Sequence, residues 1–145
     1  MSLKATIPNA ILGDPAQPDE IDRAECALGV RFPSILRELY LACDGFREPK
    51  GNAKYLLSLA DEDFIGSLIE TTRSLWADRE YWKPTGIDPT DFIFFGYSSA
   101  DEVWGIRIDA PHEVIEYHHN QEDEVTRLGE DVFEVFRNDF QKYDD

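Results

Sequence analysis

LGVRFPSILRELYLACDGF, residues 28–46, is the stretch that decides the fold, because it contains the signals that end one helix and bound the next. Gly29 closes the first helix, since glycine takes the left-handed conformation that a side chain resists. Pro33 lies in the first turn of the second helix, where its missing N–H costs no hydrogen bond. Asp44 and Gly45 are expected to end this second helix, and Gly45 is expected to have a positive φ. The stretch therefore predicts two helices joined by a short turn.

Both helices carry an apolar stripe that other parts of the chain must cover. The stripe of the second helix has the spacing of a helix that buries one side and consists of Ile35, Leu36, Leu39 and Cys43. The first helix is predicted near residues 19–28, and its inward residues are Ile21, Ala24 and Leu28. Its first turn is acidic, which the helix macrodipole favours. We therefore expect a sheet or further helices to pack against this pair.

The composition is that of one packed domain, residues 1–145, in which 42% of the residues are hydrophobic. No apolar run approaches the roughly 18 residues of a membrane span. We expect no signal peptide, because no basic segment is followed by an apolar one near the N-terminus. Cys43 lies on its apolar stripe and Cys26 lies off the neighbouring one, so the two thiols are expected to point apart. Unpaired cysteines predict a reduced, cytoplasmic protein.

The charge of the chain is strongly negative and is concentrated in the last third. Thirty acidic residues against fourteen basic ones give a net charge of −16. Residues 101–145 hold fourteen acidic and four basic residues, so this segment alone carries −10. Such a chain is repelled by nucleic acid and by anionic membranes, whereas it attracts a basic protein. Solubility alone is the simpler explanation of the same charge.

The first half continues with a strand and a third helix. After the helix pair, residues 54–59 alternate in polarity, which predicts a strand. Asp61 is a suitable N-cap for a helix that ends near Arg79. The apolar stripe of this helix consists of Phe64, Ile65, Leu68, Ile69, Leu75 and Trp76. Residues 81–91 carry the prolines and glycine of a loop, and residues 1–18 have the same character as an irregular lead-in.

The second half predicts three strands and a closing helix. Residues 92–97 are apolar on both faces, as in a central strand that is covered on both sides. Residues 102–108 and 113–119 form a hairpin around a four-residue turn, 109–112, which contains Pro111. Residues 120–124 form an acidic loop. The last helix runs near residues 130–141, and its inward residues are Val132, Phe133, Phe136 and Phe140.

The register of the hairpin follows from this turn and from the apolar residues that should share a face. It sets Ile106 opposite Ile115, Trp104 opposite Tyr117, and residue 102 opposite residue 119. Trp104 is then mostly buried. The opposite face presents Arg107, Asp109, Val114, Glu116 and His118. In this register the acidic residues before the first strand and after the second emerge at the same end of the hairpin.

The motif Glu25-x-x-Leu28-Gly29-x-x-Phe32-Pro33-x-x-Leu36-Arg37-x-x-Tyr40-x-x-x-Asp44-Gly45 resembles the opening motif of the SUKH superfamily. The second half is similar to this superfamily as well, through Phe95-Gly96, Asp101, the hairpin and the spaced phenylalanines of the last helix. The likeness spans residues 19–140. Phe32 stands where leucine is usual and Asp44 where asparagine is usual, and both keep the physical role. Residues 98–100 replace a turn that is often rich in glycine.

The resemblance implies a non-catalytic binding module, because this superfamily contains a fungal regulator of cell-wall synthesis and many bacterial immunity proteins against toxins. An immunity protein blocks a nuclease- or deaminase-type toxin domain, whose basic substrate cleft an acidic binder complements. A regulatory scaffold with several weak partners is the alternative, and a small hydrolase is a third. The fold we expect is a single α+β domain. In it, two N-terminal helices, a middle helix and a C-terminal helix pack on a mostly antiparallel sheet of about four to six strands.

Residues that could carry chemistry do not form a recognisable catalytic or metal-binding pattern. His118 and His119 are adjacent on a strand and point to opposite faces, so we expect no zinc site. The many carboxylates lie on hairpin edges and loops rather than in a predicted pocket. The serines lack a nucleophile elbow, Cys43 is expected to be buried, and the glycines are isolated. We therefore expect no catalytic residue, no metal and no cofactor.

Two groups of residues remain as candidates for function and for fold. The residues expected to bind a basic protein partner are Asp101, Glu102, Glu116, His118, Glu122, Asp123 and Glu124. The residues expected to hold the fold are Gly29, Pro33, Tyr40, Asp44, Gly45, Gly96 and Trp104.

Overall fold

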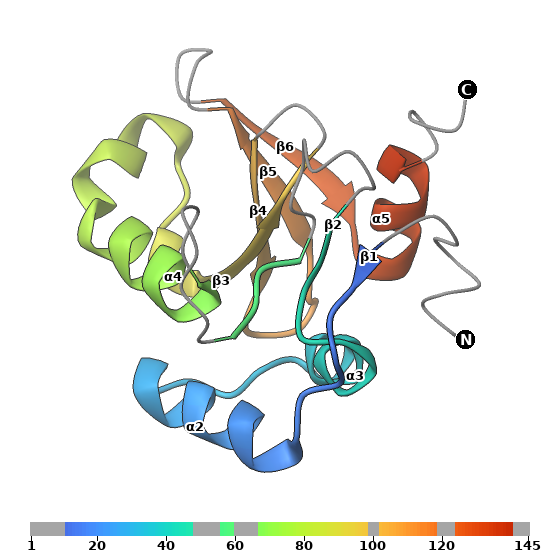
Figure 1. Cartoon of the computed structure of the whole chain (residues 1–145). Coiled ribbons are helices and arrows are strands. Elements are labelled where there is room, and N and C mark those ends of the chain that lie inside the picture. Colours follow the sequence, from blue (N-terminus) through green and yellow to red (C-terminus); the bar gives the residue numbers. More distant parts are fainter. Residues whose placement is uncertain (1–10, 48–55, 60–66, 99–101, 119–123, 141–145) are drawn as a thin grey trace.

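The centre of the fold is a four-stranded antiparallel sheet with the strand order β3-β4-β5-β6 (Figure 1). Its strands are β3 (Phe92–Tyr97), β4 (Val103–Arg107), β5 (Val114–His118) and β6 (Glu124–Gly129). The computed structural model describes residues 11–47, 56–59, 67–98, 102–118 and 124–140. A separate two-stranded ribbon pairs β1 (Ile11–Leu12) with β2 (Phe46–Arg47). The α+β prediction is confirmed, with four strands in the main sheet.

The helix pair that opens the motif is present, as α2 (Pro18–Leu28) and α3 (Ser34–Ala42). The predicted end of the second helix at Asp44 and Gly45 is late, since α3 ends at Ala42 and Cys43 is already extended. Gly29 closes α2 in the left-handed conformation, with a φ of 73°. The Glu25 carboxylate joins the two helices, because it accepts the N–H of Phe32 at 2.6 Å and the guanidinium of Arg37 at 2.8 Å. A charged acceptor binds such donors about twice as strongly as a neutral one. The motif residues therefore fix the angle between α2 and α3.

The middle of the chain differs from the sequence prediction in where its helices begin. The helix α4 (Leu68–Ala77) starts at Ser67, whose hydroxyl accepts the N–H of Glu70 at 3.1 Å, and not at Asp61. Asp61 lies outside the described residues. The predicted loop over residues 81–91 is wrong, since it contains most of the 3₁₀ helix η1 (Arg79–Thr85) and all of η2 (Pro89–Asp91). Short hydrogen-bonded turns of this kind tolerate proline and carry no helical periodicity.

Both faces of the sheet are buried, and two separate cores result. The main core joins α2, α3 and the closing helix α5 (Val132–Phe140) to one face of the sheet. The second core lies on the other face and consists of Trp82, Phe92, Phe94, Val103, Ile115 and Tyr117. Trp82 of η1 covers it by stacking on Tyr117, with ring centroids 4.2 Å apart. The helix α4 flanks β3 and contributes to both cores.

The predicted hairpin pairing is confirmed, but its register is wrong by one residue. Ile106 pairs with Val114 rather than Ile115, and Trp104 pairs with Glu116 rather than Tyr117. The Arg107 N–H donates to the Glu113 carbonyl at 2.8 Å, which leaves five residues in the turn instead of four. A change of one residue moves every side chain of a strand to the opposite face. Trp104 is nevertheless buried as predicted, with 1% of its surface exposed.

Three further strand assignments from the sequence need correction. The strand β6 was not predicted, because residues 124–129 carry too few apolar residues for a clear alternation. The predicted strand at 54–59 is reduced, within the described residues, to a single bridge at Leu56. Residues 54 and 55 lie outside the described residues. The ribbon of β1 and β2 was not predicted either, since two-residue strands leave no periodic signal.

Asp44 of the motif stabilises the fold through hydrogen bonds of its side chain. Its carboxylate accepts the N–H of Leu59 at 2.8 Å and the hydroxyl of Ser58 at 3.0 Å, so it ties the end of α3 to the segment before α4. We expect Asp44→Ala to lower the free energy of unfolding by about 2 kcal/mol, because two part-buried donors lose a charged acceptor. Asp44→Asn keeps one amide oxygen as acceptor and should cost less than about 1 kcal/mol. Urea denaturation measures both, and an equal loss in the two variants would contradict this role.

Candidate partner-binding surface

The strand ends that adjoin the predicted partner-binding residues in the sequence lie at one end of the sheet, although the predicted register was wrong. Val103 at the start of β4 pairs with Tyr117 near the end of β5, and His118 pairs with Glu124 at the start of β6. The chain therefore enters β4, leaves β5 and enters β6 at the same end of the sheet. Asp101, Glu122 and Asp123 lie outside the described residues, and of Glu124 only the main chain is described.

The described residues among those predicted to bind a partner differ in their exposure to solvent. Glu102 is buried, with 7% exposed, and its main chain closes the turn between β3 and β4. Its carbonyl accepts the Ser98 N–H at 2.8 Å, and its N–H donates to the Ser98 hydroxyl at 3.2 Å. Glu116 and His118 are half-buried on the face that carries Trp104. The Nε2 atom of His118 lies 2.9 Å from the Thr126 hydroxyl, which holds the imidazole against β6.

The residues expected to hold the fold lie in or beside the main core. Tyr40 is fully buried, and its hydroxyl donates to the Leu57 carbonyl at 2.6 Å. Burial, together with the nearby Asp44 carboxylate, raises the pKa of the Tyr40 phenol well above its usual range. Gly96 lies at the irregularity in β3, opposite Trp104. All seven except Gly29, which is exposed at the end of α2, are buried or half-buried, so they do not form a partner-binding surface.

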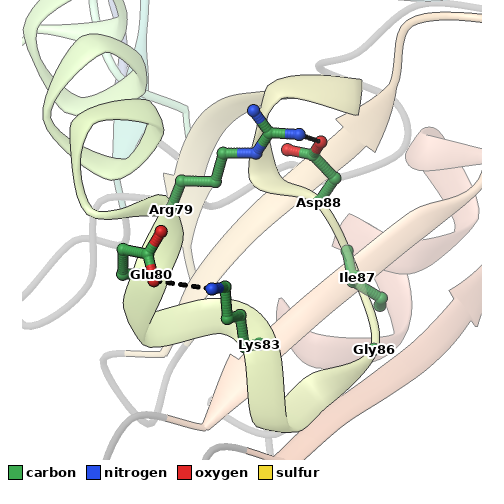
Figure 2. A pocket seen from close by; sticks show the side chains of 6 residues that line it. All are labelled: Arg79, Glu80, Lys83, Gly86, Ile87 and Asp88. Carbon is green, nitrogen blue, oxygen red and sulfur yellow. Dashed lines mark hydrogen bonds and ion pairs between the residues drawn. The ribbon is translucent and has the colours of Figure 1, made fainter.

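A shallow hollow of about 340 Å³ lies between η1 and η2 (Figure 2). Its lining residues are Arg79, Glu80, Lys83, Gly86, Ile87 and Asp88. Two ion pairs cross its rim, one between Arg79 and Asp88 and one between Lys83 and Glu80 at 2.8 Å. Sequence reasoning missed this hollow, and the i, i+3 spacing of Glu80 and Lys83 was the one available signal.

The charges of this hollow do not favour acid–base chemistry. A hydrogen bond from the Thr90 hydroxyl, assisted by Arg79, lowers the pKa of the Asp88 carboxyl below its usual range. A general acid needs the opposite shift at neutral pH. Cys43 lies elsewhere, and burial raises the pKa of its thiol to about 12, so it remains protonated and unreactive. Within the described residues, the shifted groups do not converge on one site.

The described residues also bear on metal binding and on membrane insertion. Among the described parts of the chain, no group of three histidine, cysteine or carboxylate side chains is placed to hold a metal ion. None of the helices in these parts is long and apolar enough to cross a membrane. His119, which the sequence analysis considered beside His118, lies outside the described residues.

Comparison with known proteins gives one result that covers nearly the whole fold. A model of the SMI1 / KNR4 family (SUKH-1) matches residues 15–138. The match begins just before α2 and ends within α5, so it includes the helix pair and all four strands of the main sheet. It confirms the resemblance that the motif at residues 25–45 indicates. No curated protein matches the chain.

Proposed function

This chain belongs to the SMI1 / KNR4 family (SUKH-1), and from that premise we propose that it is a non-catalytic protein-binding module that acts as an immunity protein. Its partner is a basic toxin domain of the nuclease or nucleic-acid deaminase type. The chain neutralises this toxin by occupying the surface that binds or cleaves nucleic acid.

The observation that carries this proposal is the position of the negative charge. Residues 101–145 carry −10 of the net −16. The start of β4, the end of β5 and the start of β6, which adjoin the acidic residues 101–102 and 122–124 in the sequence, lie at one end of the sheet. A concentration of negative charge attracts a basic partner. The phosphate-binding cleft of a nuclease has the required charge.

The mode of action follows from long-range attraction. An acidic surface that faces a basic cleft accelerates encounter and orients the partners, while contacts at short range set the lifetime of the complex. Blocking a cleft requires no chemistry from the inhibitor. The residues of this chain therefore need only shape, charge and a stable fold, which agrees with the structural positions of Tyr40, Asp44 and Trp104.

The test is to express the chain together with the basic toxin domain encoded beside its gene and to isolate the complex. We expect a single stoichiometric complex in which the toxin no longer cleaves or deaminates nucleic acid, and whose formation slows as salt is added. Inhibition that persists unchanged at high salt would contradict the acidic-surface mechanism. Several weak partners in place of one tight partner would instead favour a regulatory scaffold.

A further inference from the structure

The two edges of the main sheet differ in how their main-chain groups are satisfied. At the β3 edge, the Thr72 hydroxyl bonds to both the N–H and the carbonyl of Phe94, at 3.0 and 3.2 Å. The Trp76 indole donates to the Phe92 carbonyl at 2.8 Å. The helix α4 therefore closes this edge with side chains, beside β3 in Figure 1. At the opposite edge, β6 pairs with β5 and with no further strand among the described residues.

The main-chain groups of β6 that face outward can be identified from the hydrogen bonds of β4. In an antiparallel strand, successive residues point their N–H and carbonyl groups to alternate sides. The Arg107 N–H donates to Glu113 across the β4–β5 gap, and the Ile108 N–H donates to Asp91 on the other side. Odd-numbered residues of β4 therefore face β5. Their partners Ile115 and Tyr117 then face back toward β4.

The same alternation carries across to β6. Glu116 and His118 face β6, so their partners Thr126 and Glu124 face β5. The residues left over are Val125 and Arg127, whose N–H and carbonyl groups point away from the sheet. No hydrogen bond joins these groups to any other part of the chain that the structure describes. As far as the described residues are concerned, two donors and two acceptors are left in the spacing of a strand.

The closing helix does not cover this edge. Phe136 of α5 packs edge-on against Phe95 and tilts against Trp104, with ring centroids 5.7 and 5.5 Å away. These contacts reach β3 and β4 across the main-core face of the sheet. Phe136 of α5 therefore lies over the main-core face of the sheet and not beside the outward groups of β6. An exposed edge of this kind is a template for pairing with another chain.

The charge of the residues in and around β6 indicates which kind of chain can pair with its outer edge. Residues 113–134, which include β5, β6 and the start of α5, hold eight acidic residues and one basic residue, a formal charge of −7. The one basic residue is Arg127, and Glu113 already pairs with it at 3.1 Å. A second copy of the chain would bring the same negative charge to the edge and be repelled. A basic segment would be attracted.

We propose that the β6 edge binds an extended, basic segment of the partner protein by strand addition, through the outward main-chain groups of Val125 and Arg127. This inference rests on the proposed function for the identity of the partner, and it adds the mode of recognition. Main-chain hydrogen bonds supply the binding in this mode, while the alternating side chains of the added strand select it.

The experiment uses a probe in place of the partner. The isotope-labelled full chain is titrated at low salt with the peptide acetyl-KVKVKVK-amide and followed by NMR. The control peptide acetyl-KKPPKKP-amide has the same charge, but its prolines interrupt the N–H donors on both sides of the strand, so no register offers donors to both the Val125 and the Arg127 carbonyls. We expect the first peptide to bind about tenfold more tightly than the second, because only it can complete the edge. Amide exchange should slow at Val125 and Arg127 and stay unchanged at Thr126.

A matched pair of variants separates the main chain from the side chain. Arg127→Ala and Arg127→Pro both remove the ion pair with Glu113, whereas only the proline removes the outward N–H. Because Arg127→Ala removes a positive charge near the edge, we expect it to bind the valine peptide at least as tightly as the parent chain does, and Arg127→Pro to bind it about tenfold more weakly than Arg127→Ala. The amide-exchange pattern of the parent chain provides a readout that needs no variant to fold.

Three outcomes would overturn the inference: equal binding of the two peptides, equal binding by the two variants, or pairing of β6 with a second copy of the chain. The proposed function fails separately. A toxin complex that forms without slowing amide exchange at Val125 and Arg127 would support the immunity role and rule out strand addition. Peptide binding at β6 in the absence of any toxin complex would support strand addition and rule out the immunity role.

Discussion

Gly45→Val is expected to lower the free energy of unfolding by about 3 kcal/mol, through both backbone strain and steric overlap. Gly45 has a φ of 103°, a conformation that residues with a side chain rarely adopt, which confirms the prediction of a positive φ. A Cβ at this position would lie 3.1 Å from the Leu56 carbonyl and 3.2 Å from the Ser58 nitrogen. These are main-chain atoms next to the hydrogen bonds of Asp44, so they cannot move aside cheaply.

Gly29→Val is the matched control for this prediction. Gly29 also has a positive φ, 73°, but nothing lies within 4 Å of a Cβ built there. Its valine variant carries the backbone strain alone, and we expect a loss of about 1–2 kcal/mol. Urea denaturation of both variants measures the difference. Equal losses would show that the contacts of Gly45 with the segment before α4 contribute nothing, and a negligible loss in both would remove the strain argument as well.

Reversing Glu122, Asp123 and Glu124 to lysine is expected to slow association with the toxin domain by about tenfold or more at low salt. The change replaces three of the acidic residues at the end of the sheet where β6 begins, and so it weakens the steering of a basic partner. The dissociation rate should change less. The melting temperature should remain close to that of the parent chain, because no residue of the two cores is changed and surface charges in general contribute little to stability.

A second triple variant distinguishes local charge from total charge. Asp14, Glu38 and Glu70 are exposed residues outside the β4–β6 part of the fold, and their reversal to lysine changes the net charge by the same amount. We expect this variant to associate much faster than the first. Stopped-flow kinetics at two ionic strengths measures both. An unchanged association rate in the first variant, or the same rate in both, would rule out a localised acidic site.

The helix pair could be predicted almost residue by residue, because its signals are local. Gly29, Pro33 and Gly45 act on the main chain at their own positions, whatever the rest of the chain does. The α+β class followed from the order of apolar patterns, and the burial of Trp104 and Cys43 followed from their stripes. The family match agrees with the motif that these same residues form.

The register of the hairpin was not predictable from the apolar pattern, for a reason that lies in the second core. The pattern of apolar residues specifies a register when one face of the sheet is buried and the other is exposed to solvent. Here Trp104 and Ile106 pack into the main core, while Ile115 and Tyr117 pack into the second core under Trp82. With both faces apolar, the burial of apolar residues does not by itself decide between the two registers. The turn length, which the sequence left open, decides between them.

The sequence by itself determined the local events of this protein: where the first helices end, which side of each is buried, and how much negative charge the last third carries. The tertiary structure decided which distant segments meet. It brought the start of β4, the end of β5 and the start of β6 to one end of the sheet. It also closed the β3 edge with Thr72 and Trp76 and left β6 as the other edge of the described sheet. Caps and stripes depend on neighbours within a few residues, whereas strand pairing and edges depend on contacts that no local pattern records.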